Sequence, residues 1–277
     1  MNNNQHIHII GGTGQMGSWT AKLLAKHGYR VTVSGKHKKD SKSIEECDAL
    51  LISIPLHEAP GIISKALYVI KPTTTIIDFS SLMSLVEPVF QSSRNPVASI
   101  HFLFGPTTTS LQSQHIITNI IRSSQFITQI IELFEQEGAL THCMTSKEHD
   151  ITMAHIQALT QISNLSLTKT VCDNGIGLLP SFSTPTFTSQ SNIMLRVLNN
   201  NSTELLTNLQ LYNPYFPNIL KQHIKTQQEL LDMLIRKQEV LLRNTYEAIR
   251  TQVVLSEQAA QAENIKIDHV KRELDIL

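Results

Sequence analysis

One glycine-rich stretch near the start of the chain constrains the fold more than any other feature. An apolar run at residues 6–10 leads directly into Gly-Gly-Thr-Gly-Gln-Met-Gly at residues 11–17, and apolar residues at helical spacing follow. This pattern predicts a buried strand, a tight turn and a helix. In such a unit Gly12 allows the turn, Gly14 lets the backbone approach a phosphate, and Gly17 lets the helix pack closely on the strand. The stretch therefore predicts a dinucleotide site, with the pyrophosphate at the helix N-terminus.

The residues of this stretch that we predict to contact the dinucleotide are Gly12, Thr13, Gly14, Gln15, Met16 and Gly17.

The first half of the chain alternates between strand-like and helix-like patterns. Strands are expected at residues 6–10, 30–34, 49–54, 75–78, 97–101, 115–118 and 140–143. Their apolar runs do not alternate with polar residues, which is typical of parallel strands buried on both faces. We therefore predict an α/β fold, with an N-terminal Rossmann-type doubly wound parallel sheet that binds ligands at the carboxyl ends of its strands.

The pattern changes near residue 145. Residues 145–148 read Thr-Ser-Lys-Glu, a capping box that begins a helix, and no convincing strand follows. We predict a dinucleotide-binding domain at residues 1–145 and an all-helical substrate and dimerisation domain at residues 146–277. The long apolar repeats of residues 222–252 exceed what one sheet and its helices can cover, so a homodimer through the helical domain is expected. The polar residues after about 255 form either a peripheral helix or a frayed tail.

Composition limits the possible partners. The 23 basic residues balance 23 acidic ones, which disfavours nucleic acid and anionic membranes as partners. No apolar run approaches the length of a membrane span, and the N-terminus does not read as a signal peptide. Three cysteines, Cys47, Cys143 and Cys172, are scattered without metal-ligand spacing. We therefore expect no metal site, and reduced thiols in a cytoplasmic protein. The expected partner is a small-molecule substrate.

The segment after the second expected strand bears on the choice of dinucleotide. NAD enzymes carry an acidic residue there for the ribose hydroxyls, whereas a basic environment accommodates the extra phosphate of NADP. Here Ser34 is followed by Lys36, His37 and two further lysines, with no acidic residue before Asp40. A hydroxyl followed by cations suits a phosphate. Ser34 and Lys36 therefore favour NADP over NAD, the alternative being a solvated basic loop.

A histidine stands at the end of the fifth expected strand, in the segment His-Phe-Leu-Phe-Gly-Pro at residues 101–106. In a fold of this kind that position faces the nicotinamide. His101 could then accept a hydroxyl proton while hydride leaves the attached carbon. The alternative is a purely structural histidine.

Five motifs, in order along nearly the whole chain, resemble the prephenate and arogenate dehydrogenase family of tyrosine biosynthesis. Residues 11–17 resemble its GGxGxMG fingerprint, 53–57 its S-V-P segment, and 78–81 its D-x-x-S. Residues 101–106 resemble its H-P-M-F-G-P, and 148–159 its E-H-D…M-A…Q-A-L helix.

The resemblance implies an NAD(P)-dependent oxidative decarboxylation of prephenate or arogenate, and a homodimer joined through the helical domain. It implies that His101 is the base on the ring hydroxyl and that Ser81 hydrogen-bonds nearby. It also implies that Ser53 and Pro55 border the cofactor, and that His149 lies near the substrate cleft.

The chain departs from the family at the groups that bind substrate carboxylates. Gln161 stands where the family has a substrate-contacting histidine, and Thr188 where it has an arginine. An arginine fork contributes a few kcal/mol to carboxylate binding, so its loss should weaken binding of a dianion. Arg196 lies about two turns further on and could compensate.

Three interpretations follow from these departures. Prephenate or arogenate is bound by other cations, or the substrate is a related cyclohexadiene that lacks one carboxylate. Alternatively, the chain is a catalytically weak nucleotide-binding homologue with a regulatory or structural role. Retention of His101 and Ser81 favours an enzyme.

Overall fold

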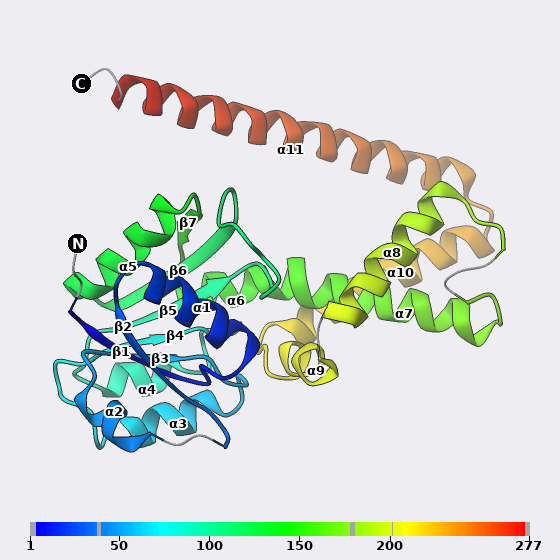
Figure 1. Cartoon of the computed structure of the whole chain (residues 1–277). Coiled ribbons are helices and arrows are strands. Elements are labelled where there is room, and N and C mark those ends of the chain that lie inside the picture. Colours follow the sequence, from blue (N-terminus) through cyan, green and yellow to red (C-terminus); the bar gives the residue numbers. More distant parts are fainter. Residues whose placement is uncertain (1–3, 38–39, 178–180, 201, 275–277) are drawn as a thin grey trace. The chain divides into compact units, whose positions relative to one another are not determined.

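The computed structural model of the chain describes residues 4–37, 40–177, 181–200 and 202–274 (Figure 1). The chain divides into two compact units, Met1–Ile219 and Leu220–Leu277. The boundary between them lies inside helix α10 (Phe216–Ile235).

The first unit is built on a seven-stranded sheet with the strand order β2-β1-β3-β4-β5-β6-β7. The strands are β1 (His6–Ile10), β2 (Arg30–Ser34), β3 (Ala49–Ile52), β4 (Thr75–Asp78), β5 (Val97–Phe102), β6 (His115–Arg122) and β7 (Leu140–Cys143). All seven expected strands are therefore present, and the predicted α/β sheet is confirmed.

Helices cover both faces of this sheet. They are α1 (Gln15–Lys26), α2 (Ser41–Glu46), α3 (Ala59–Ala66), α4 (Glu87–Ser92) and α5 (Gln125–Gln136). Successive residues of a strand point to opposite faces. Leu51 thus packs in the cluster that holds residues of α1 and α5, whereas its neighbour Leu50 packs with residues of α3 and α4. Two apolar layers result, as a doubly wound fold requires.

The predicted parallel pairing holds except between β5 and β6, which are antiparallel to each other. A parallel neighbour needs a crossover, usually a helix, whereas a connection without one returns the chain in the opposite direction. Residues 103–114 between β5 and β6 contain no helix. Helix α5 does connect β6 to β7, and these two strands are parallel to each other. The sheet is therefore mostly parallel.

The rest of the chain is helical among the described residues. It comprises α6 (Ser146–Met153), the π-helix η1 (Ala154–Leu159), α7 (Thr160–Asp173), α8 (Pro185–Asn200), α9 (Thr203–Leu211), α10 (Phe216–Ile235) and α11 (Glu239–Leu274). The capping box at Thr145 and Glu148 is present, with both reciprocal hydrogen bonds. The division at residue 145 coincides with the start of α6, but the compact units separate later, at Ile219. The boundary at 145 stays a prediction.

The second unit consists of most of α10 and all of α11. Helix α11 includes the polar residues after about 255, so their described part is helical. Many apolar side chains of this unit are exposed: Ile224, Leu231, Leu234, Ile235, Val240, Leu241, Tyr246, Ile249, Val253, Val254 and Leu255. Within the described ranges, no helix combines the length and apolarity that a membrane crossing needs.

Candidate active site

The glycine loop joins β1 to α1 and allows no side chain at its closest approaches. A Cβ at Gly12 would lie 2.6 Å from the Cβ of Val33, and one at Gly17 would lie 2.3 Å from the carbonyl oxygen of Gly11. Gly14 is the N-cap of α1 and leaves the first-turn N–H groups without a side-chain acceptor. The exposed Thr13 backbone and these N–H groups can hold a pyrophosphate. The loop therefore fits a dinucleotide.

The loops after β2 and β3 pack against the glycine loop. A Cβ at Gly35 would lie 2.0 Å from Oγ1 of Thr13, and one at Gly11, whose φ is +82°, would lie 2.0 Å from the carbonyl oxygen of Ser53. Pro55 is exposed two residues later. The expected cofactor segments thus meet at one edge of the sheet.

The two residues expected to distinguish NADP from NAD differ in their surroundings. Lys36 is exposed, whereas Ser34 is buried with its hydroxyl 2.9 Å from Nε2 of His8. The Ser34 hydroxyl is therefore engaged inside the sheet. The two further lysines of the predicted basic segment, Lys38 and Lys39, lie outside the described residues.

His101 lies near the carboxyl end of β5 and begins a buried chain of polar groups. Its Nδ1 is 2.9 Å from Nε2 of His149, and Nδ1 of His149 is 2.6 Å from Oδ1 of Asp150. The exposed fraction is 4% for His101 and 0% for the other two residues. His149 thus contacts His101, and its expected place near the substrate stays a prediction.

The Asp150 carboxylate is held by the loop after β4. Its oxygens accept hydrogen bonds from the N–H groups of Met83 and Ser84, each 3.0 Å away, and from the Ser84 hydroxyl. The Asn213 amide donates to the Asp150 carbonyl oxygen at 2.8 Å. Burial alone would raise the pKa of Asp150, but these donors and His149 outweigh it and leave the pKa lowered.

His101 itself is held in its neutral form. Burial lowers the pKa of His101 to about 3, and the neighbouring His149 adds to this effect, while Asp150 opposes it. A neutral imidazole offers a lone pair on one ring nitrogen, as a base requires. Ser81 is half-buried two residues before Met83, in the loop that binds Asp150.

The remaining expected substrate residues lie on α7 and α8. Gln161 is half-buried, and its Oε1 finds no donor among the described residues. Thr188 is exposed and donates to Oγ of Ser183 at 2.9 Å. The residue pattern predicted neither the Asn213 contact nor the Ser84 contact, because both join Asp150 to residues more than 60 positions away in the chain.

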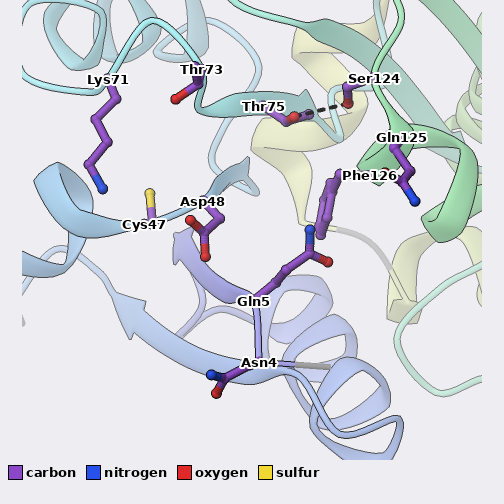
Figure 2. Close-up of a pocket in the computed structure, with 10 residues that line it drawn as sticks. All are labelled: Asn4, Gln5, Cys47, Asp48, Lys71, Thr73, Thr75, Ser124, Gln125 and Phe126. Carbon is purple, nitrogen blue, oxygen red and sulfur yellow. Dashed lines mark hydrogen bonds between the residues drawn. The ribbon is translucent and has the colours of Figure 1, made fainter. Parts of the chain in front are cut away.

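A separate hollow of about 450 Å³ lies at the opposite edge of the sheet (Figure 2). Cys47, Asp48 and Thr75 line it, at the amino ends of β3 and β4. Open sheets of this kind bind ligands at the carboxyl ends of strands. Burial also raises the pKa of the Cys47 thiol to about 12, so this thiol is no nucleophile. The hollow is not part of the site at His101.

No family model matches the chain. Two curated relatives are similar in sequence. A protein named "Probable arogenate/prephenate dehydrogenase" from Methanocaldococcus jannaschii is 22% identical over 260 residues, which cover 85% of this chain and 58% of the relative. A T-protein from Enterobacter agglomerans is 27% identical over 175 residues, covering 62% and 47%. The chain spans about half the length of these relatives.

Solved structures agree in fold. Synechocystis arogenate dehydrogenase has a TM-score of 0.68 at 15% identity, covering 87% of this chain and 96% of its own. Prephenate dehydrogenase from A. aeolicus, in complex with hydroxyphenyl propionate and NAD+, has a TM-score of 0.69 at 15% identity, covering 90% and 96%. Sequence and fold together confirm the predicted resemblance of this chain to the prephenate and arogenate dehydrogenase family.

Proposed function

We propose that this chain is an NAD(P)-dependent dehydrogenase that oxidatively decarboxylates prephenate or arogenate, with His101 as the base. The observation that carries the proposal is a neutral, buried histidine near the end of β5, at the carboxyl edge where β1 enters the glycine loop. The names of the relatives support the substrate class. The two alternative interpretations are a substrate that lacks one carboxylate and a catalytically weak homologue. Neither is needed to explain the similarity to these relatives.

The residues of the chain have mainly to position and polarise the substrate, because aromatisation of the ring drives the reaction. A bound nicotinamide would supply the hydride acceptor. His101 accepts the proton of the ring hydroxyl while hydride leaves the attached carbon and the ring carboxylate leaves as carbon dioxide. Ser81 hydrogen-bonds in the same neighbourhood, and burial of His101 keeps its imidazole in the neutral form.

The test is steady-state reduction of NAD and NADP by the full chain with prephenate, arogenate and a neutral analogue. His101→Asn should lower kcat by about 10²- to 10⁴-fold with the cofactor Kd unchanged, as expected for a lost general base. His115→Asn removes an exposed histidine on β6 and should leave kcat near wild type. Turnover of neither acid by the wild-type chain would contradict the proposal.

The same proposal includes a preference for NADP. It is supported by the exposed Lys36, in a loop that packs on the glycine loop, and by the lack of an acidic residue before Asp40. The buried Ser34 contributes less than its sequence position suggests, since its hydroxyl contacts His8. Lys36→Ala should weaken NADP binding about tenfold and NAD binding little, while Lys42→Ala, at an exposed lysine of α2, serves as control. Equal losses for both nucleotides would contradict the preference.

A homodimer through the helical region also belongs to the proposal. Its support is the row of exposed apolar side chains on α10 and α11, including Leu234 at 60% and Val240 at 73% exposure. Light scattering should give about twice the 31.1 kDa chain mass. Leu234→Asp should shift that mass towards the monomer, and a wild-type monomer with full activity would contradict the dimer.

The proposal finally places the protein in the cytoplasm, where its free cysteines would stay reduced.

A further inference from the structure

We infer that His149 and Asp150 are positioning residues that fix the tautomer of His101, so that its Nε2 carries the lone pair that acts as the base. The inference deepens the proposed function and rests on it. It starts from the hydrogen-bond chain His101–His149–Asp150 and from the fixed direction of each donor in that chain.

The direction is set at the Asp150 end. The backbone N–H groups of Met83 and Ser84 can only donate, and each lies 3.0 Å from an oxygen of the Asp150 carboxylate. These contacts favour the ionised carboxylate, which can only accept. The hydrogen bond between Asp150 and His149 therefore runs from the imidazole to the carboxylate, and Nδ1 of His149 must carry its proton.

The proton on Nδ1 of His149 determines the direction of the next hydrogen bond, between His149 and His101. A neutral His149 protonated on Nδ1 has a lone pair on Nε2. That nitrogen lies 2.9 Å from Nδ1 of His101, so His101 must donate from Nδ1. A neutral His101 protonated on Nδ1 has its lone pair on Nε2. Burial of His101 disfavours an additional proton on its ring.

The same chain assists the step in which His101 accepts a proton. The imidazolium formed on His101 donates through His149 towards an anion that is fixed by two backbone groups. The carboxylate therefore stabilises the developing positive charge without moving. Asn213 donates to the Asp150 carbonyl oxygen and so holds α6 at this residue.

The first measurement needs no variant. In the chain labelled with ¹⁵N-histidine, the imidazole of His101 should show a protonated Nδ1 and an unprotonated Nε2 at neutral pH. Spectra of His101→Asn and His149→Gln assign the two residues by the loss of one signal set each. A protonated Nε2 on His101 in the wild-type chain would overturn the inference.

The second measurement removes the acceptor. Asp150→Ala leaves Nδ1 of His149 without the carboxylate oxygen that accepts its proton, so the tautomer of His101 is no longer fixed. We expect the His101 signals to include a protonated Nε2 and kcat to fall by about 10²- to 10⁴-fold, with the Kd of NAD(P) unchanged. If His101 keeps the wild-type tautomer in Asp150→Ala, or if kcat stays within threefold of wild type, the result counts against the inference.

A pair of variants at His149 separates direction from packing. His149→Gln still offers one donor to Asp150 and one acceptor to His101, whereas His149→Leu offers neither. The glutamine variant should retain at least about tenfold more kcat than the leucine variant, and equal losses would overturn the inference. Fluorescence of Trp19, the single tryptophan, verifies that each variant is folded.

The two levels of the proposal can fail separately. If the wild-type chain turns over neither prephenate nor arogenate but His101 shows the expected tautomer, the proposed substrate fails and the hydrogen-bond chain stands. If turnover is found with the opposite tautomer, the proposed function stands and the positioning role is overturned.

Discussion

Removal of the buried His101 imidazole should change how stability depends on pH. The unfolded chain binds a proton at this histidine below its ordinary pKa of 6.5, whereas burial lowers the pKa in the folded chain to about 3. Between these values the unfolded state binds the proton and the native state does not. The wild-type chain therefore loses stability from His101 as the pH falls below about 6.5, and the loss continues down to about 3.

The magnitude follows from the displacement of the pKa. One pH unit in that window corresponds to about 1.4 kcal/mol. Acidification from about pH 7.5 to about pH 5 crosses roughly 1.5 units of the window, so His101 should cost the wild type about 2 kcal/mol of unfolding free energy. His101→Asn lacks this term, and its amide can still donate to Nε2 of His149. The variant should therefore show the smaller loss over the same interval.

Urea unfolding followed by Trp19 fluorescence measures this difference. Trp19 lies on α1 and packs against Phe102 and Phe104, so it reports on the unit that holds the sheet. His37→Asn, which removes an exposed histidine, is the matched control. Parallel pH dependence in wild type and His101→Asn would refute the reasoning, because the cost of charging the buried imidazole would then be absent.

Three further changes have defined expectations. Gly17→Ala should weaken NAD(P) binding at least about tenfold in titration calorimetry, because its Cβ would lie 2.3 Å from the Gly11 carbonyl oxygen. In the control Gly61→Ala the added Cβ meets no atom within 4 Å. This variant should bind NAD(P) normally and gain about 0.5–1 kcal/mol of stability. Burial raises the Asp78 pKa to about 7, so the stability that the protonated Asp78 carboxyl contributes is lost as pH rises from about 4 to 7. Asp78→Asn should gain up to about 4 kcal/mol of unfolding free energy relative to the wild type over that range. A difference between the two chains that does not change with pH in urea unfolding would contradict this. Arg122→Ala removes donors to three backbone carbonyl groups and should cost about 3 kcal/mol in the same assay; a loss under about 1 kcal/mol would contradict it.

The local elements could be predicted because their causes are local. Short apolar runs bounded by turn residues predicted all seven strands, and the glycine spacing at residues 11–17 predicted the loop whose contacts exclude side chains. The pairing of Thr145 with Glu148 is likewise contained in four consecutive residues. His101 could be placed because a residue at the end of a parallel strand always reaches the carboxyl edge of the sheet.

The direction of β6 and the partners of the site residues depended on contacts between distant segments. The apolar run of β6 is equally compatible with parallel and antiparallel pairing, and its position beside β5 decided the outcome. Ser34 appeared as a free hydroxyl until the pairing of β1 with β2 brought it to His8.

The sequence by itself therefore determined the strands, the glycine loop and the histidine that stands at the edge of the sheet. Tertiary structure alone decided that His149, 48 residues further on, contacts that histidine and that two backbone N–H groups hold the carboxylate behind it. The physical reason is that strand and turn preferences act over a few residues. The direction of a buried hydrogen bond depends on which donors and acceptors the folded chain brings within 3 Å of one another, at the distances typical of hydrogen bonds.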